Sequence, residues 1–505
     1  MERKWWTLIA VCVATFMLLL DITIVNVALP SIQEDLDASF SSLQWVVDAY
    51  ALTLASFLLV FGSLGDRLGR RRIFAIGFGL FTVASLLCGL AGDATVLNVF
   101  RALQGVGAAA MFATSLALIA QEFEGRERTK AIGIWGATVG GAVAIGPLVG
   151  GVLTDGLGWE WIFFVNVPIG IAAIVLTETR LANIAATDAQ PIDWAGVLTF
   201  SLALFGLIFG LIRGNAEGWG SAPIVLSLGG AAVLMAAFIA IQSRRENSML
   251  DLSLFRVPAF GGVSIVAFAL SAGMFAMFLY VTLYMQDVLE LSPLEAGARF
   301  LPLTILSFLV APLAANLSGR IPVRLIMGLG LILVGVGLLL MHGVDVGDEW
   351  TGLLPGFIVA GIGIGMTNPM IAETALAVVP AARAGMASGI NSTFRQAGIA
   401  TGVAGLGAVF ESQIHSGLGA IPEQARDGFA EAVSSGAIDQ AVAQAPAQVQ
   451  SGALEAAQNA FVSGFNEILL IGAAVAIVGG VLGLILVRRR DFVAAPAAEP
   501  EPAAA

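Results

Sequence analysis

Two opposite charges stand inside apolar stretches of the chain, and they are the first candidates for chemistry. Asp21 lies in LLLDITIVNVALP, nine residues before Pro30, and Arg101 lies in LNVFRALQGVGAAA. A carboxylate takes up and releases a proton, whereas an arginine keeps its charge and stabilises a carboxylate beside it. A charge at such depth is costly and indicates a function by default. We therefore expect the pair to serve proton transfer; the alternatives are a structural acid at Asp21 and, at Arg101, an arginine that reaches the membrane surface.

A basic loop, Gly62–Arg72 with the sequence GSLGDRLGRRR, separates the apolar runs 44–64 and 73–91. Each run has about 20 residues, the length of a helix that crosses a bilayer. Clustered arginines in a short loop fix it on the cytoplasmic side. Asp66 is expected to lie by a helix amino terminus or to pair with an arginine, and Gly62 to permit close helix approach. The loop is predicted to latch two halves of the protein at the inner face; the alternative is a polar turn that only sets the topology.

A proline among glycines marks the end of the apolar run 130–153. These residues are Gly146, Pro147, Gly150 and Gly151. Proline kinks a helix because it removes a backbone hydrogen bond, and glycines make a thin face for another helix. We expect a kinked, closely packed helix here.

Three further charges lie near the ends of apolar runs. Asp48 is near the outer end of the second run, and Glu373 is near the inner end of the twelfth. Each either attracts a cationic substrate or is solvated at a helix end, and both alternatives stay open. Arg395, in NSTFRQAG, is expected to anchor its helix at the inner interface.

The composition excludes an ordinary soluble domain. Of the 505 residues, 58% are hydrophobic and 12% are charged, against about 25% charged in soluble domains. The mean hydropathy is +0.90, and the net charge of −12 does not favour nucleic acid. Cys12 and Cys88 lie in apolar runs, so we expect buried thiols, no disulfide and no metal. No nucleophile–base constellation, ATP site or cofactor motif is visible, so an ion gradient is expected to supply the energy.

Fourteen apolar runs follow one another along the chain. They are 7–29, 44–64, 73–91, 96–120, 130–153, 161–177, 194–213, 222–242, 259–285, 296–317, 324–342, 351–374, 387–410 and 464–487. An even number of crossings puts both termini on one side of the membrane. Most of the 24 Lys and Arg then fall at inner positions, as the positive-inside rule requires. The sequence predicts an all-α integral membrane protein with both termini in the cytoplasm.

A weak internal repeat divides the chain. Leu317–Arg324, LSGRIPVR, is similar to a decayed copy of the first loop, with Gly319 where the aspartate would be. Runs 1–6 then correspond to runs 9–14, and runs 7 and 8 are an inserted pair. The predicted division is a first six-helix bundle at 1–178, a linker with the inserted helices at 179–258, a second bundle at 259–490 and a disordered tail at 491–505. The outer loop 411–463 is expected to hold short amphipathic helices or to be loosely ordered.

Several motifs resemble those of the major facilitator superfamily, and specifically its fourteen-helix drug:proton antiporters. The loop motif is carried by Gly62, Asp66, Arg67, Gly69, Arg70 and Arg71. The first-helix motif is carried by Asp21, Thr23, Asn26, Ala28 and Pro30, the fourth-helix motif by 97–109 and the antiporter motif by 146–151. The chain departs from the family at Ala142, where glycine is usual, and at Glu160, where arginine is usual.

The resemblance implies a transporter and not an enzyme. It implies proton-coupled export of hydrophobic, cationic compounds across the plasma membrane by alternating access, with Asp21 and Arg101 at the coupling site. The expected partners are a small-molecule substrate, protons and the lipid bilayer, and the protein is expected to be a monomer. The alternative is an exporter dedicated to one metabolite, antibiotic or lipid.

Overall fold

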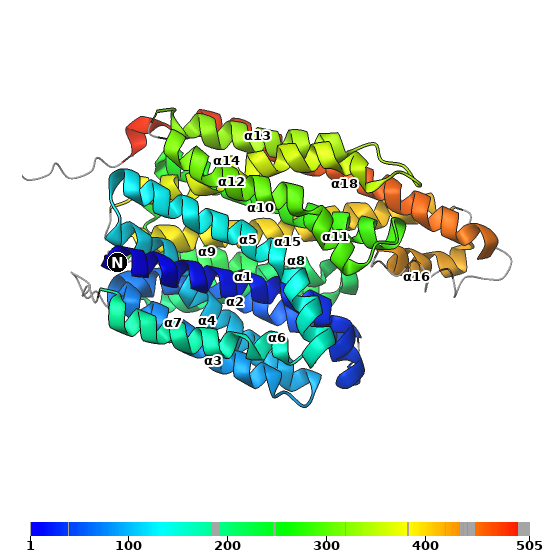
Figure 1. Ribbon diagram of the computed structural model, residues 1–505, viewed down its shortest axis with the longest axis horizontal. Helices are drawn as coiled ribbons and strands as arrows, with labels where there is room; N and C mark the ends of the chain where they lie inside the picture. The colour runs from blue at the N-terminus through cyan, green and yellow to red at the C-terminus, as the bar shows by residue number, and fades with distance from the viewer. Residues whose placement is uncertain are drawn as a thin grey trace, which may run out of the picture.

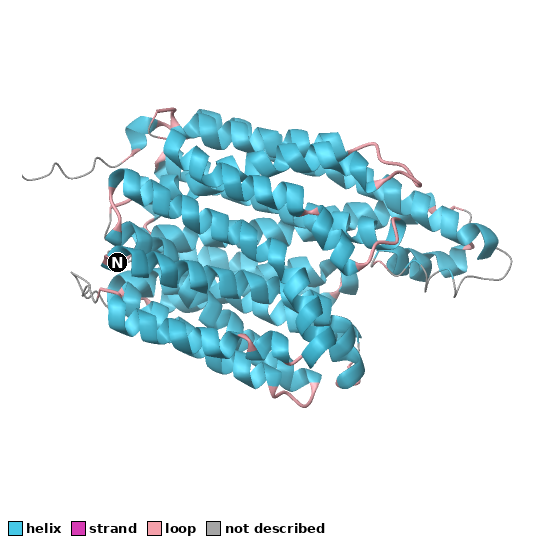
Figure 2. Cartoon of the chain, viewed as in Figure 1, coloured by secondary structure: helices cyan, strands magenta, loops and turns pink. Residues whose placement is uncertain are grey.

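The structure is a computed structural model of the whole chain. It describes residues 2–38, 40–182, 192–245, 249–318, 320–380, 383–419, 421–434, 436, 438, 442 and 450–492. Every regular element within these residues is helical (Figure 2). A helix satisfies its own backbone hydrogen bonds, which an apolar chain in a bilayer requires.

The helices run roughly parallel to one long axis of the molecule (Figure 1). The first nine are α1 (Arg3–Asp35), α2 (Phe40–Leu68), α3 (Arg70–Gly89), α4 (Ala94–Glu122), α5 (Gly125–Leu157), α6 (Trp161–Phe164), α7 (Asn166–Arg180), α8 (Trp194–Glu217) and α9 (Ala222–Gln242). The later ones are α10 (Pro258–Leu283), α11 (Pro293–Arg299), α12 (Leu301–Leu317), α13 (Val323–Met341), α14 (Leu354–Ala377), α15 (Ala384–Gly417), α16 (Glu423–Ser434) and α18 (Gln450–Leu486). Further elements among the described residues are short 3-10 or π helices: η1 (Leu252–Arg256), η2 (Tyr284–Val288), η3 (Trp350–Leu353) and η5 (Arg489–Asp491).

Each of the fourteen predicted apolar runs falls on helix. Among the described residues, eleven helices are long and apolar enough to cross a membrane. The remaining runs fall on α5, on α15, and on α11 with the 17-residue α12. The all-helical class is therefore confirmed, whereas a count of fourteen crossings stays a prediction.

The same packing pattern occurs twice in the chain. In the N-terminal half (α1–α7), α1 packs on α5, and both α2 and α3 pack on α4. In the C-terminal half (α10–α18), α10 packs on α15, and both α12 and α13 pack on α14. The halves meet through two matching contacts, α2 with α15 and α12 with α5. Helices α8 and α9 pack on each other, and α8 also packs on α2 and α15.

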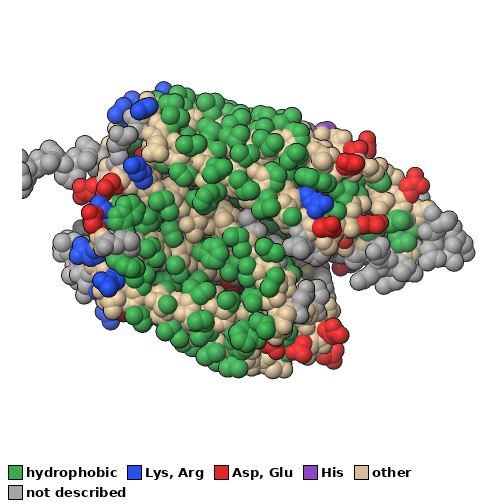
Figure 3. All heavy atoms as spheres, in the orientation of Figure 1, with side chains coloured by type: hydrophobic (Ala, Val, Ile, Leu, Met, Phe, Trp, Pro, Cys, Tyr) green, Lys and Arg blue, Asp and Glu red, His purple; other side chains and the backbone are tan. Residues whose placement is uncertain are grey.

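Charged side chains gather at the two ends of the helices, with an apolar belt between them (Figure 3). Most visible Lys and Arg lie at the end that holds the α2–α3 and α12–α13 junctions, here called the arginine end. Asp and Glu are prominent at the opposite end, here called the acidic end, which holds the α3–α4 and α13–α14 junctions.

Much of the predicted outer loop 411–463 is a continuation of its flanking helices. Helix α15 runs on to Gly417, and α18 begins at Gln450. Between them lies the amphipathic helix α16, which packs on α15 and α18. Of the two alternatives for this segment, the described part favours packed helices. Most of 435–449, the predicted linker residues 183–191 and the tail residues 493–505 lie outside the described residues.

Glycine lets α2 and α4 approach within backbone contact. A Cβ on Gly105 would lie 2.2 Å from Thr53 Oγ1 and 2.4 Å from the Tyr50 carbonyl oxygen. Any larger residue must push the two helices apart. A Cβ on Gly79, on α3, would have no atom of another helix within 4 Å.

Gly105→Ala is expected to destabilise the protein by about 1–3 kcal/mol, because the added methyl overpacks the α2–α4 contact. The measurement is the thermal unfolding midpoint of purified protein, with Gly79→Ala as the matched control. Equal midpoints for the two variants would contradict the close packing described here.

Candidate functional site

Asp21 and Arg101 form an ion pair in the interior of the N-terminal half. The Arg101 guanidinium donates to Asp21 Oδ2 at 2.5 Å. The side chains are 0% and 1% exposed, respectively. Helix α1 supplies the carboxylate and α4 the guanidinium, so residues 80 apart in sequence meet in one site.

Three neutral side chains complete the site around Asp21. Gln104 donates to Asp21 Oδ1 at 2.8 Å and accepts from Arg101 at 2.7 Å. Asn166, the first residue of α7, donates to Asp21 Oδ1 at 3.4 Å and to Ser85 Oγ at 3.1 Å. Ser85, on α3, also accepts from Gln104 at 3.2 Å. Both carboxylate oxygens of Asp21 therefore have hydrogen-bond donors.

Arg101 is held on its other sides by α2. Its Nε donates to the Val46 carbonyl oxygen at 2.9 Å, and its Cζ lies 4.4 Å from the centre of the Tyr50 ring. A buried guanidinium is stable only when its donors are satisfied and its charge is neutralised. Both side chains are buried, and every donor and acceptor named here lies on the protein itself.

The glycine motif of α5 lies directly behind this site. A Cβ on Gly146 would lie 1.8 Å from Thr23 Oγ1, and one on Gly150 would lie 3.0 Å from Ile24. Both contacts are with α1, two and three residues after Asp21. A Cβ on Gly151 would have no neighbour within 4 Å. The side chain of Pro147 lies outside the described part.

Asp66 fastens the arginine end of α2 to the first turn of α15. Its Oδ1 accepts from the Gly385 backbone N–H at 3.0 Å, and its Oδ2 accepts from that of Met386 at 2.8 Å. Arg70 also donates to Asp66, at 2.8 Å. The first N–H groups of a helix have no acceptor within the helix and carry its positive dipole end, so a carboxylate there is favoured. These contacts of Asp66 are called the Asp66 latch below.

The other residues of the first loop shape and support the latch. A Cβ on Gly62 would lie 2.4 Å from the Gly385 carbonyl oxygen, so only glycine fits. Gly69 separates α2 from α3 and has a φ of 99°, a value that favours glycine. Arg70 also donates to the Ala117 carbonyl oxygen on α4, and Arg71 pairs with Glu178 on α7. Arg67 lies beside them, near the carboxylates of Asp66 and Asp193.

Asp48 and Glu373 lie apart from the ion pair. Arg213 of the inserted helix α8 lies 3.9 Å from Asp48 and donates to Gln44 at 2.8 Å. Glu373 accepts from Ser318 at 3.5 Å, near the arginine end of α14.

Arg395 differs from its expected place. It lies eleven residues into α15 and donates to Asn368 of α14 at 2.6 Å. It therefore cannot anchor the beginning of its helix at an interface, because those eleven residues correspond to about 16 Å of helix.

The sequence contained a signal for part of the site that was missed. Gln104 follows Arg101 by three residues, a spacing that places both on one helix face. Asn166 lies six residues after Glu160, one of the positions where the chain departs from the family, and nothing at that position indicated its role. Ser85 and Tyr50 had no signal, because their roles depend on which helices pack together.

Known proteins match most of this chain. A sequence profile of the Major Facilitator Superfamily matches residues 11–403. A tetracenomycin C resistance and export protein of Streptomyces glaucescens is 33% identical, over 99% of this chain and 95% of its own. The multidrug resistance protein Stp of Mycobacterium tuberculosis is 38% identical over 82% of this chain and 77% of its own. The multidrug efflux pump LfrA of Mycolicibacterium smegmatis is 32% identical over 94% of this chain and 96% of its own.

A solved structure shares the architecture. The human organic anion transporter MFSD10 superposes with a TM-score of 0.61 over 94% of this chain and 100% of its own, at 13% identity. At that identity the likeness concerns the fold. Together with the profile and the relatives, it leads to one conclusion: the chain belongs to the Major Facilitator Superfamily.

Proposed function

We propose that the protein exports hydrophobic, cationic drugs or toxic compounds across the cytoplasmic membrane in exchange for protons. The observation that carries the proposal is the buried Asp21–Arg101 pair in a transporter fold. Burying a charged carboxylate costs desolvation energy even when the charge is paired. A charge at this depth in a membrane protein is therefore typical of a functional site. The relatives whose names include resistance, export or efflux support the direction of transport.

The proposed coupling depends on the two states of the Asp21 side chain. When a proton neutralises Asp21, the ion pair with Arg101 is lost and only a weaker hydrogen bond from the guanidinium to a neutral acceptor remains. Arg101 then keeps its bonds to Gln104 and to the Val46 carbonyl oxygen. Its positive charge is no longer balanced, which favours a rearrangement of α1 against α4. Loss of the proton to the cytoplasm restores the pair. Each transport cycle therefore carries a proton from the outside to the cytoplasm.

The Asp66 latch is proposed to stabilise the state in which the arginine end is closed. It joins α2 to α15, one of the two matching helix pairs that meet across the halves. The matching contact of α5 with α12 closes the other side, where a Cβ on Gly133 would lie 3.1 Å from Ala315. Opening toward the cytoplasm requires that both contacts separate.

The proposed topology has fourteen crossings, arranged as two six-helix bundles with α8 and α9 inserted between them. The repeated packing of α1–α7 and α10–α18 supports the two bundles. Under the positive-inside rule the arginine end faces the cytoplasm, so both termini lie inside. The protein is proposed to act as a monomer without a cofactor.

A second candidate is an exporter dedicated to one antibiotic or other metabolite. It is favoured by the tetracenomycin C relative, which aligns with almost the whole chain. Competition experiments distinguish the two candidates. Unrelated lipophilic cations compete with one another for efflux by a multidrug pump, but they do not compete with the substrate of a dedicated exporter.

Arg72→Cys and Asp427→Cys test the topology in a background with Cys12→Ser and Cys88→Ser. Because Arg72 is at the arginine end and Asp427 is on α16 at the acidic end, a membrane-impermeant maleimide applied to intact cells should label only the cysteine at 427. Permeabilised cells provide the control for reactivity at 72. Labelling of both positions in intact cells would refute the proposed sidedness.

Asp66→Asn is expected to lower transport about tenfold at unchanged membrane expression. The substitution removes the charge that faces the α15 amino terminus, a contact in the range of about 1–2 kcal/mol. Initial efflux rates in cells report the change. Arg72→Gln is the matched control, since it removes a charge from the same loop at an exposed position. If both variants transport like wild type, the loop serves only the topology.

Asp21→Asn is expected to abolish proton-driven efflux, because the side chain keeps an oxygen acceptor but can no longer exchange a proton. Arg101→Lys is expected to fail or to shift the pH optimum, because lysine lacks the planar fork that contacts Asp21 and Gln104 together. The measurement is substrate-dependent proton flux in proteoliposomes with a pH-sensitive dye. Thermal unfolding of each variant separates loss of coupling from loss of fold.

Asp48→Asn and Glu373→Gln are the comparison variants for this experiment. Both carboxylates lie apart from the ion pair, so their removal should leave proton flux in place. If Asp21→Asn kept uphill transport with its normal pH dependence while either comparison variant lost it, the coupling site would lie at that residue instead.

A further inference from the structure

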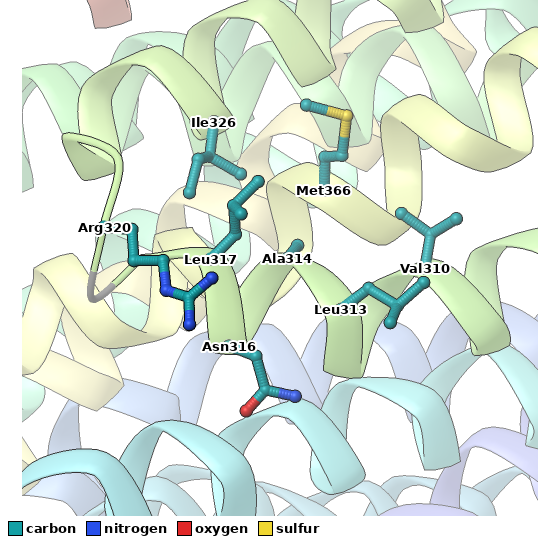
Figure 4. A pocket seen from close by; sticks show the side chains of 8 residues that line it. All are labelled: Val310, Leu313, Ala314, Asn316, Leu317, Arg320, Ile326 and Met366. Atoms are coloured by element: carbon teal, nitrogen blue, oxygen red, sulfur yellow. The ribbon is translucent and has the colours of Figure 1, made fainter.

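A groove lies on the C-terminal half between α12 and α13. Helix α14 packs against both of these helices, and the α12–α13 junction lies at the arginine end. The groove has a volume of about 450 Å³, within the range of about 300–1,000 Å³ that holds small molecules. Its lining residues are Val310, Leu313, Ala314, Asn316, Leu317, Arg320, Ile326 and Met366 (Figure 4).

The wall of the groove is apolar and open to the surroundings of the protein. Leu313 and Leu317 follow each other by one helical turn on α12 and are 64% and 40% exposed. Ile326 and Met366 line the groove from α13 and α14. In a protein with an apolar belt of this kind, such a surface lies against the hydrocarbon of the bilayer. The occupant must therefore be apolar along most of its length.

One end of the groove is positively charged. Arg320 lies at that end, beside Leu317 and Asn316 (Figure 4). Within the described residues, its guanidinium makes no ion pair or hydrogen bond, and Arg324 follows in the first turn of α13. In the matching loop of the N-terminal half the sequence has Asp66, whereas here it has Gly319. The second loop thus keeps its arginines without that carboxylate.

We propose that this groove binds an anionic phospholipid of the cytoplasmic leaflet. One acyl chain lies along Leu313 and Leu317, and the phosphate binds the Arg320 guanidinium, with the Asn316 amide as a further donor. Arginine matches phosphate geometry with two parallel N–H donors, and basic residues at the cytoplasmic surface attract anionic headgroups. The proposal requires the arginine end to be cytoplasmic, and it does not depend on proton coupling.

The bound lipid would support the helix that closes the cytoplasmic side. Pro312 and Ala315 of α12 face Gly133 of α5, on a different side of α12 from Leu313 and Leu317. An acyl chain in the groove therefore fills the space behind the α5–α12 contact. Lipid composition is expected to change the stability of that contact and not the ion pair of the N-terminal half.

The test is native mass spectrometry of the purified full-length protein with added dioleoyl phosphatidylglycerol or dioleoyl phosphatidylcholine. Wild type is expected to retain one phosphatidylglycerol in preference to phosphatidylcholine. Arg320→Gln should weaken that adduct about tenfold, as the loss of a charge-assisted contact predicts. Leu317→Trp, which fills the groove from an exposed position, should weaken the adducts of both lipids.

Arg256→Gln is the matched control, because Arg256 is an exposed arginine of η1 that does not line the groove. It should leave the adduct unchanged. The proposal is overturned if wild type shows no preference for phosphatidylglycerol, or if Arg256→Gln weakens the adduct as much as Arg320→Gln does. It is also overturned if ethidium displaces the lipid and binds Arg320→Gln as well as wild type, since the groove would then be a substrate entry.

Discussion

A charge in a dry helical interior must be neutralised by its neighbours, and the N-terminal half is arranged around that requirement. Asp21 and Arg101 neutralise each other, and Gln104, Asn166 and Ser85 supply the remaining donors and acceptors. These residues come from α1, α3, α4 and α7, and α2 adds the Val46 carbonyl. Removing one partner from such a pair typically costs about 3–5 kcal/mol. The charge state of one carboxylate therefore influences how several helices pack.

Helix α5 connects this charge to the opposite half of the protein. Its glycines at 146 and 150 pack on α1 immediately after Asp21, and Gly133 packs on α12. Because these glycines bring α5 into close contact with α1 and α12, one helix has little room to slide without moving its neighbour. In the proposed cycle, a rearrangement of α1 after protonation would be transmitted along α5 to the α5–α12 contact. Helix α5 therefore joins the Asp21–Arg101 ion pair to the α5–α12 contact between the halves.

The sequence predicted the helices and the charged residues better than it predicted their contacts. Apolar runs of spanning length are a strong signal, and each one falls on helix. Asp21 and Arg101 were recognised because a charge in an apolar run is conspicuous. Ser85 was not recognised, because a serine in an apolar helix becomes informative only when its neighbours are known. The apolar run predicts a helix from residue 387 and places Arg395 near an interface, whereas the helix begins at Ala384 and Arg395 lies in its interior.

The continuation of α15 beyond the apolar run was missed for a related reason. Residues 411–417, ESQIHSG, are mostly polar, so hydropathy ends the span at 410, while the helix continues to Gly417. Hydropathy reflects the membrane environment, whereas the end of α15 lies where it packs on α16 and α18.

The Asp66 latch has a consequence for the evolution of this protein. Its acceptor is a side chain, but its donors on α15 are main-chain amides of Gly385 and Met386. Main-chain amides are unchanged by every substitution except proline. A substitution other than proline at position 386 therefore leaves the hydrogen bond itself in place, so the latch requires no correlated pair of substitutions between Asp66 and residue 386. Methods that infer contacts from co-varying positions would overlook a contact that holds the two halves together.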